Sequence, residues 1–436
     1  MPAKKSDPRG ADARSIAARV LGRVRRDQAY AAAALDAELE RHPQLDARER
    51  ALATELCYGS LRCRGALLER LRALAPRGIA GGDPEVEAHL LVAAYQLSVL
   101  SRVPDFAAVN AAVVAIKKLR GPKLGGFANA VLRKLAAGEK LERSEAVLAS
   151  APLWLRERLE QAVGIDEARA LLGAEPEAAA PGVALRLVGS GELPGWLAGA
   201  GTGRASPRSR IVRRVGDPRR LAGYAEGAFV VQEEGAQVVG LALGAREGER
   251  VLDACAGRGQ KSSLLAEQVG AAGELWATDI HSSKLRALAA ELARLGLPAA
   301  HTLAVDWSVG GGEVPGDFDR VLVDAPCTGT GTLRRRPEIA LRLESGDPAR
   351  LGELSARILE HAASHARPGG RIVFAVCSVL PEEAERVVER VAHLLEPAPF
   401  DVSGLDGVCE PRATSFRLLP GRHGTDGYFV ASFVRR

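Results

Sequence analysis

The 436-residue sequence has no apolar run that approaches the roughly 20 residues of a membrane-spanning helix, so we expect no contact with a membrane. Its first residues are polar and lack the apolar core of a secretory signal, which predicts a cytoplasmic protein. Six cysteines are scattered without a Cys-x-x-Cys pair or a nearby His pair, so we expect neither a disulfide scaffold nor a metal site. Each thiol is then either a buried apolar side chain or a nucleophile.

The length is two to three times that of a usual domain, which predicts more than one hydrophobic core. Apolar residues make up 47% of the chain and charged residues 26%, as in globular proteins. Residues 1–150 hold 25 Lys and Arg against 17 Asp and Glu, whereas the remainder holds 34 against 37. This asymmetry is consistent with a polyanionic partner. It is equally consistent with helices that simply carry Arg on their solvent-exposed faces.

A second basic cluster lies in a stretch with only one acidic residue, Asp217, and its density favours a role in binding phosphates. Its members are Arg204, Arg208, Arg210, Arg213, Arg214, Arg219 and Arg220.

Residues 13–137 place apolar side chains three and four positions apart and contain no period-two stretch, which predicts helices throughout. Asp46 with Glu49 is typical of a capping box, and Asp83 before Pro84 is typical of a helix start. An all-α domain is therefore expected at the front of the chain.

From residue 250 onward, apolar strands alternate with helices, which predicts an α/β fold with a doubly wound, mostly parallel sheet. The expected strands are 251–255, 275–279, 303–306, 320–324, 371–376 and 428–434, and the expected helices are 261–269, 283–295, 350–366 and 381–394. The ligand site of such a sheet lies at the carboxyl ends of its strands. Three domains are predicted: all-α over 1–145, small and mixed over 146–225, and α/β over 226–436.

The first of these strands ends near Asp253 and leads into a turn with Gly257 and Gly259, where a ligand can approach the backbone. The third glycine of a dinucleotide site is missing. Asp279 and Asp306 end the next two strands, where carboxylates can bind a ribose and an adenine amine. Either acid alone could cap a helix, but two acids at equivalent positions at the ends of successive strands favour a ligand site. So many acids would repel a phosphate-bearing cofactor and favour the sulfonium of S-adenosylmethionine.

Two further strands deliver Cys327 and Cys377 to the same edge of the sheet, where neighbouring strands would bring them close. Methylation of cytosine carbon 5 needs a thiolate that adds to carbon 6 and a base that removes the carbon 5 proton. Asp324 is placed to hydrogen-bond the ring. A helix start at 381–383 would lower the pKa of Cys377. Either cysteine alone fits a buried apolar residue, but the pair favours this chemistry.

Several segments resemble motifs of the Sun/Fmu (RsmB/NSUN) family of RNA cytosine-C5 methyltransferases. They are residues 231–234, 253–262, 324–339, 377–383 and 426–429. The helical front resembles the NusB-like RNA-binding domain of bacterial members in residues 55–59, 107–110 and 126–133. The resemblance implies a class I, Rossmann-like methyltransferase fold behind a NusB-like domain, and a bacterial 16S ribosomal RNA enzyme.

The resemblance also implies roles for individual residues. Cys377 would be the nucleophile, Cys327 the thiol that helps product release, and Asp324 the carboxylate that contacts the base. Lys261 would also reach towards the cytosine. S-adenosylmethionine would be held by Cys255, Ala256, Gly257, Arg258, Gly259, Gln260, Lys261, Asp279, Asp306 and Asp324.

The sequence departs from the family pattern in the cofactor turn, where Gly257-Arg258-Gly259-Gln260 replaces Ala-Pro-Gly-Gly and puts a bulkier, charged loop beside the cofactor. Val376 replaces the usual Thr, Ala384 a common Asn, and residues 185–188 read Leu-Arg-Leu-Val instead of Leu-Arg-Val-Asn. None of these changes removes a catalytic group, so an active enzyme is expected.

We therefore expect a monomeric 16S rRNA (cytosine-C5)-methyltransferase that acts on an RNA hairpin or unassembled ribosomal RNA and uses no metal. Three alternatives remain. The same chemistry could act on tRNA, or the chain could be a non-catalytic RNA-binding ribosome assembly factor whose altered turn no longer binds cofactor. An NAD-dependent dehydrogenase is disfavoured by the missing glycine and the paired thiols.

Overall fold

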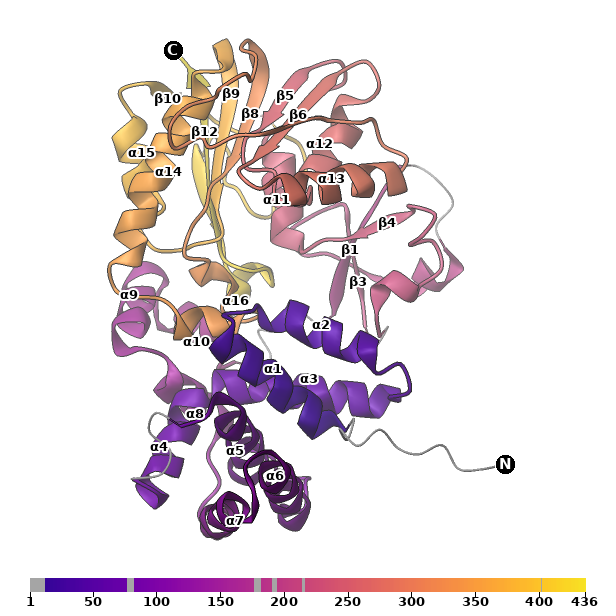
Figure 1. Ribbon diagram of the computed structural model, residues 1–436. Coiled ribbons are helices and arrows are strands. Elements are labelled where there is room, and N and C mark those ends of the chain that lie inside the picture. Colours follow the sequence, from indigo (N-terminus) through magenta and orange to yellow (C-terminus); the bar gives the residue numbers. More distant parts are fainter. Residues whose placement is uncertain (1–11, 77–81, 176–181, 190–193, 214–215, 401) are drawn as a thin grey trace. The chain divides into compact units, whose positions relative to one another are not determined.

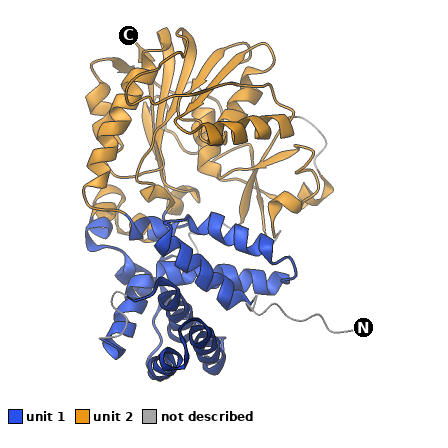
Figure 2. Cartoon of the chain, in the orientation of Figure 1, with its two compact units in different colours: residues 1–157, 172–176, 333–342 blue, residues 158–171, 177–332, 343–436 orange. Residues whose placement is uncertain are grey.

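The computed structural model describes residues 12–76, 82–175, 182–189, 194–213, 216–400 and 402–436 (Figure 1). The chain forms two compact units, coloured separately in Figure 2. The helical unit comprises residues 1–157, 172–176 and 333–342, and the α/β unit comprises residues 158–171, 177–332 and 343–436. The predicted three-domain division stays a prediction. Within the described ranges, no helix is both long and apolar enough to span a bilayer.

The front of the chain is helical, as predicted. Its helices are α1 (Ala13–Arg26), α2 (Ala31–Arg41), α3 (Ala47–Arg62), α4 (Arg64–Leu74), α5 (Pro84–Ser98), α6 (Asp105–Arg120), α7 (Pro122–Ala136) and α8 (Arg143–Ser150), followed by α9 (Leu153–Val163) and α10 (Ile165–Leu172). Helix α5 is buried along most of its length because α1, α3, α4, α6 and α7 pack around it. The core of the helical unit therefore surrounds α5.

The predicted helix starts are confirmed. Asp46 accepts a hydrogen bond from the Glu49 amide at 2.8 Å, and Asp83 accepts one from the Glu85 amide at 2.8 Å. Only half of the capping box forms, because the Glu49 carboxylate accepts from the amide of Ala13 at 3.0 Å instead. Glu49 therefore joins the start of α1 to α3.

A segment from the second half of the sequence, residues 333–342, packs within the helical unit. Glu338, in a short 3-10 helix (Pro337–Leu341), is buried and accepts from the amide of Ala31 at 3.0 Å. Arg62 donates to the backbone oxygen of Arg334 at 2.7 Å. The arginine-rich part of the segment 324–339 thus belongs to a different unit from the strand that precedes it.

The α/β unit is built on an eight-stranded sheet with the order β10-β12-β9-β8-β5-β6-β7, in which β11 pairs with β12. Its strands are β5 (Arg250–Asp253), β6 (Glu274–Asp279), β7 (His301–Ala304), β8 (Phe318–Asp324), β9 (Ala366–Val376), β10 (Leu395–Pro397), β11 (Ser415–Leu418) and β12 (Tyr428–Arg435). The five strands from β9 to β7 run parallel, and β12 runs antiparallel to β9. This arrangement confirms the predicted mostly parallel sheet.

Helices cover both faces of this sheet, so it is doubly wound (Figure 1). Its helices are α11 (Glu234–Ala242), α12 (Ser262–Val269), α13 (Ser282–Arg294), α14 (Asp347–Ala363), α15 (Glu385–Val391) and α16 (Pro420–His423). Leu264 of α12 and Leu288 of α13 pack into the core of one face. Leu359 of α14 and Val387 of α15 pack into the core of the other.

Four of the predicted elements were wrong in extent. The strand expected at 251–255 is β5, which ends at Asp253, and the strand expected at 303–306 is β7, which ends at Ala304. The helix expected at 381–394 is only α15, because residues 381–384 form turns. The helix expected at 350–366 ends at Ala363, and β9 begins at Ala366 rather than at residue 371. The short strands β10 and β11 were not predicted.

A second, four-stranded sheet with the order β2-β3-β1-β4 lies within the α/β unit. Its strands are β1 (Val183–Leu187), β2 (Gly201–Thr202), β3 (Ser209–Val212) and β4 (Phe229–Val231), with short 3-10 helices at Gly195–Gly199 and Pro218–Arg220. Its small core contains Leu185, Leu197 and Phe229. The rings of Phe229 and Trp196 form a T-shaped contact, with their centroids 5.7 Å apart.

Arg186 ties this small sheet to the main sheet. Its side chain is fully buried and donates to Gln232 Oε1 at 2.7 Å, Ser263 Oγ at 2.8 Å and Glu267 Oε2 at 2.5 Å. Burial lowers the pKa of Arg186 to about 10, against the opposing effect of Glu267, so it stays charged at neutral pH. Gln232 in turn donates to the backbone oxygen of Gln260 at 2.8 Å. Arg186 therefore supports the turn before α12.

We expect Arg186→Ala to lower the free energy of unfolding of the α/β unit by roughly 1–3 kcal/mol, because Gln232 and Ser263 would lose a buried hydrogen-bond partner while Glu267 keeps its ion pair with Arg208. Denaturant unfolding followed by circular dichroism measures the change. Arg213→Ala, at an exposed position of the same sheet region, is the control and should unfold like the wild type. Equal midpoints for Arg186→Ala and wild type would contradict the structural role of Arg186.

Candidate active site

The site begins with the pairing of β8 and β9. These strands run parallel, and their register ends where Asp324 lies opposite Ala375. Cys327 and Cys377 follow in the loops that leave the two strands, and their sulfur atoms lie 3.4 Å apart. The proximity predicted from strand order is confirmed. Both residues are partly exposed, so the pair lies at an accessible edge of the sheet.

The two thiols are not equivalent. Contact with the sulfur of Cys377 and burial both raise the pKa of Cys327 well above its usual range, and the carboxylate of Glu383 adds to the effect. Cys327 therefore keeps its proton at neutral pH. The predicted contribution of a helix start to Cys377 is not supported, because α15 begins only at Glu385.

A buried ion pair lies beside the thiols. Lys261 Nζ is 2.5 Å from Asp324 Oδ2, and the lysine is almost fully buried whereas the carboxylate is about a quarter exposed. Burial disfavours the ammonium form of Lys261, but Asp324 outweighs burial and raises the pKa of Lys261, and Cys377 adds to this effect. The pair offers one hydrogen-bond donor and one acceptor near the sulfur of Cys377.

The turn between β5 and α12 is shaped for a ligand that approaches the backbone. Gly257 and Gly259 adopt φ angles of +59° and +86°, in the left-handed region that favours glycine. A Cβ on Gly259 would lie 2.7 Å from Leu288 Cγ, so the turn also needs this glycine to pack on α13. Nothing lies within 4 Å of a Cβ built on Gly257, which leaves open space there.

The other residues of this turn differ in exposure. Ala256 is buried, and its amide donates to the Thr278 oxygen at 2.8 Å, while Cys255 is partly exposed. Arg258 and Gln260, which depart from the family pattern, are exposed. The extra bulk of these two side chains therefore does not fill the protein interior.

Asp279 ends β6, as predicted, whereas the prediction that Asp306 ends the next strand was wrong, because β7 stops at Ala304. Asp279 is buried and accepts from the His281 amide at 2.8 Å and from Lys284 Nζ at 3.2 Å. Asp306 is exposed, lies two residues beyond β7 and accepts from the Ser308 amide at 2.9 Å. Lys284 was missed, although its position five residues after Asp279 was a usable signal. It makes this edge less negative than the sequence suggested.

Asp253 is a further buried carboxyl group at the end of β5. Its Oδ2 accepts from Ser262 Oγ at 2.7 Å, and no described residue donates a hydrogen bond to its buried Oδ1. Burial raises the pKa of Asp253 to about 7, against the opposing effects of Ser262 and Lys261. An unpaired oxygen at the edge of the predicted cofactor site fits a ligand with hydrogen-bond donors or positive charge.

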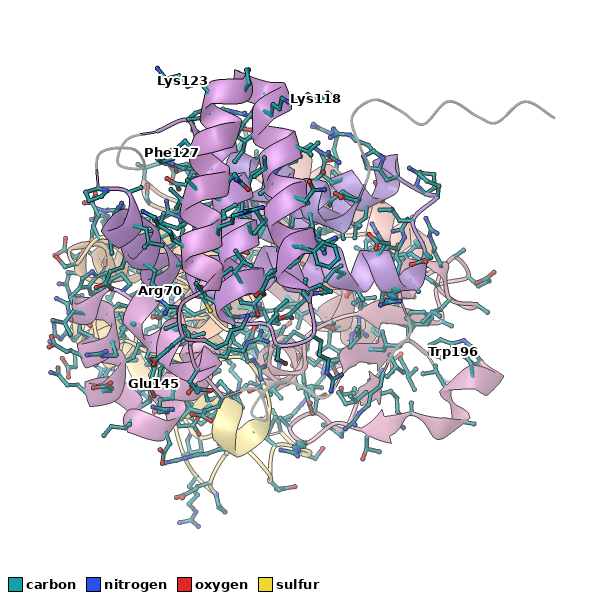
Figure 3. All side chains as sticks on the ribbon, turned by 90° about the horizontal axis from the view of Figure 1, so that it is seen from below. Arg70, Lys118, Lys123, Phe127, Glu145 and Trp196 are labelled. Atoms are coloured by element: carbon teal, nitrogen blue, oxygen red, sulfur yellow. The ribbon has the colours of Figure 1, made fainter. Side chains whose placement is uncertain are left out.

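The basic cluster is partly neutralised. Arg208 forms an ion pair with Glu267, and Arg219 pairs with Asp217 at 2.9 Å. Arg213 is exposed, and Arg214 lies outside the described residues. In the helical unit, Lys118 and Lys123 project from the ends of α6 and α7 (Figure 3). The described residues contain no group of His, Cys, Asp and Glu that could hold a metal ion.

Comparison with known proteins identifies the family. The profile of the NusB family matches residues 11–137, and that of the family described as 16S rRNA methyltransferase RsmB/F matches residues 240–434. A methyltransferase of Mycobacterium tuberculosis is 36% identical over 97% of this chain and 96% of its own length. Ribosomal RNA small subunit methyltransferase B of Salmonella paratyphi A is 31% identical over 89% of this chain and 91% of its own length.

Solved structures share the fold. The protein PH0851 superimposes with a TM-score of 0.80 at 22% identity, covering 99% of this chain and 100% of its own. NSun6 from Pyrococcus horikoshii, solved with SFG, gives a TM-score of 0.55 at 17% identity over 65% of this chain and 98% of its own.

The fold and these relatives define an S-adenosylmethionine-dependent RNA methyltransferase with an N-terminal NusB-like domain. Within this class, the chain belongs to the RsmB/F family of 16S rRNA methyltransferases. The family resemblance and the fold class predicted from the sequence are both confirmed.

The raised pKa of Asp253 makes folding stability depend on pH. The folded chain holds the proton more tightly than the unfolded chain, so this stabilisation is complete below about pH 4 and is lost as the pH rises through about 7. We expect the free energy of unfolding of wild type to fall more steeply between about pH 5 and 8 than that of Asp253→Asn. Denaturant titrations at several pH values measure both slopes. Asp406→Asn, at an exposed position, should keep the wild-type slope, whereas equal slopes for wild type and Asp253→Asn would refute the assignment.

Proposed function

We propose that this methyltransferase modifies carbon 5 of a cytosine in 16S ribosomal RNA through a covalent adduct between Cys377 and carbon 6. The observation that carries the proposal is the pair of sulfur atoms 3.4 Å apart at the ends of adjacent parallel strands. A methyl transfer to an exocyclic amine needs no thiol, whereas the ring carbon needs one to be activated and a second group to assist release.

In this proposal the Cys377 thiolate adds to carbon 6, so that carbon 5 becomes nucleophilic and attacks the methyl group. Loss of the carbon 5 proton to a base then lets the Cys377 sulfur leave carbon 6, which restores the aromatic ring. Cys327, which keeps its proton before the reaction and whose sulfur lies 3.4 Å from that of Cys377, assists this release by donating its proton to the departing Cys377 sulfur. Asp324 accepts from the cytosine amine and Lys261 donates to a ring acceptor, so that both hold the base during addition.

S-adenosylmethionine fits the edge formed by β5, β6 and β7, where it would supply an electrophilic methyl group on a sulfonium. The residues that would hold it are Cys255, Ala256, Gly257, Arg258, Gly259, Gln260, Lys261, Asp279, Asp306 and Asp324. The open glycine turn and the unpaired oxygen of Asp253 support this placement. The acids here suit a cation better than a phosphate.

Ribosomal RNA is the proposed substrate because the relatives that align with both units are named ribosomal RNA small subunit methyltransferases. The exposed lysines of α6 and α7 and the exposed Arg213 suit phosphate contacts. The cytosine must leave its stack to reach the sulfur atoms, which favours a loop or an unassembled RNA.

We expect the wild-type chain to transfer a labelled methyl group to carbon 5 of cytosine in unmodified 16S rRNA, and Cys377→Ala to lose transfer by at least about 1,000-fold because the nucleophile is gone. Nuclease digestion and mass spectrometry identify the product. Cys409→Ala, which alters a partly exposed cysteine outside the site, is the control and should stay active. Label that enters tRNA instead would redirect the substrate assignment. Transfer that survives in Cys377→Ala would refute the mechanism.

Cys327→Ala should leave the adduct formed but slow its release, so a protein–RNA species should accumulate that survives denaturing electrophoresis. The double variant Cys327→Ala/Cys377→Ala lacks the attacking sulfur and should show no such band. A Cys327→Ala protein that turns over normally, without a retarded band, would remove the release role from Cys327.

A further inference from the structure

A buried carboxylate joins the two loops that carry the thiols. Glu383 is fully buried, and its Oε1 accepts from the Thr328 amide at 2.6 Å. Its Oε2 accepts from Thr328 Oγ1 at 2.5 Å and from Ser378 Oγ at 2.5 Å. Thr328 directly follows Cys327, and Ser378 directly follows Cys377. One side chain therefore holds the residue next to each thiol.

These loops need such a link because the pairing between β8 and β9 ends before them, although Val376 still pairs with Phe429 of β12. The register of β8 and β9 ends at Asp324 and Ala375, and each cysteine lies two or three residues farther on. Beyond the strands, the amide of Gly331 donates to the Cys377 oxygen at 2.9 Å, and Thr330 Oγ1 lies 2.9 Å from Ser378 Oγ. Neutral contacts thus supplement the link, but Glu383 is the charged group among them.

The partners of Glu383 are a backbone amide and two hydroxyl groups. Among the described residues no Lys or Arg forms an ion pair with it, so its charge is compensated by hydrogen bonds alone. Its neighbour Glu382 differs: it lies 3.7 Å from both Arg158 and Arg386. Adjacent glutamates therefore serve different purposes, which provides a matched control.

We propose that Glu383 is a positioning residue that fixes the Cys327 and Cys377 loops at reactive spacing and places a negative charge beside Cys327. This inference rests on the proposed function of the two thiols. The bridge formed by Glu383, Thr328 and Ser378 sets the sulfur–sulfur distance, and the buried negative charge opposes ionisation of Cys327. The structure thus separates the roles of two chemically identical side chains through a residue that does not contact the substrate.

Two substitutions of Glu383 separate the effect of side-chain length from the effect of negative charge. Glu383→Gln keeps the length of the side chain but removes its charge, and Glu383→Asp keeps the charge but is one methylene too short to reach both loops. A loss of alignment of about 1 Å costs on the order of 100-fold in rate. We expect Glu383→Asp to lower kcat for methyl transfer by that order with an unchanged KM for S-adenosylmethionine. Glu382→Gln should behave like wild type.

The charge is tested by the pH dependence of alkylation of Cys327 with iodoacetamide, in a Cys377→Ala background that removes the other sulfur of the pair. Mass spectrometry of the peptide that contains Cys327 separates its alkylation from that of the four remaining cysteines. Other charged groups around the thiols are Glu382, Lys261 and Asp324, and they remain in every variant except the control Glu382→Gln. We expect Glu383→Gln to shift the midpoint for Cys327 to lower pH, and Glu383→Asp and Glu382→Gln to leave it nearly unchanged. A merely structural role would not produce this difference.

The results discriminate between the inference and the proposed function. If Cys377→Ala keeps methyl transfer, the proposed function fails, whereas the alkylation experiment still reports on Glu383 because it needs no turnover. If Cys377→Ala is inactive but both Glu383 variants match wild type in kcat and in the alkylation midpoint, the positioning role is refuted. Thr328→Val removes one hydroxyl donor to Glu383 and keeps the amide contact. This variant tests the bridge if Glu383→Gln does not fold. An unchanged kcat in Thr328→Val would then overturn the inference.

Discussion

The parallel pairing of β8 with β9 is the constraint on which the site depends. Their apolar side chains are buried on both faces of the sheet, so the strands cannot shift in register without exposing core residues. Because the last paired residues are Asp324 and Ala375, both loops leave the sheet at the same level. Two cysteines 50 positions apart in the chain thereby come within contact distance. The chemistry proposed for them depends on this geometry.

Sequence reasoning located the strand ends well, because parallel strands are apolar runs whose ends are marked by acids, glycines and cysteines. Sequence reasoning could not find the side chains that hold the loops beyond those strand ends. Glu383 bonds to Thr328 across 55 positions, and nothing in the local pattern distinguishes it from Glu382. The turns at 381–384 replaced a predicted helix start for a related reason, since the position of Glu383 is set by tertiary contacts. The strands β10 and β11 are too short to give a periodic signal.

The segment 333–342 illustrates a different limit of sequence reasoning. Its three consecutive arginines continue the motif after Cys327, which favoured placing it with the sheet. In the structure it packs in the helical unit, where Glu338 is buried against the start of α2. A buried carboxylate that accepts a backbone amide at a helix start is stabilised by both the hydrogen bond and the helix dipole. The motif therefore serves the packing of the helical unit as well as the loop that precedes it.

The charges around the site follow one logic. Three carboxyl groups lie at the carboxyl ends of the strands or in the loops beyond them: Asp253, Asp324 and Glu383. The ammonium group of Lys261 lies in the same region and pairs with Asp324. Burial holds the pKa of Asp253 near 7, so this carboxyl group lowers the negative charge of the site when it keeps its proton. Such a region suits a neutral base and a cationic methyl donor, and it repels phosphate. The proposed RNA substrate would then need basic side chains elsewhere for its backbone, and the excess positive charge of the chain lies in its first 150 residues.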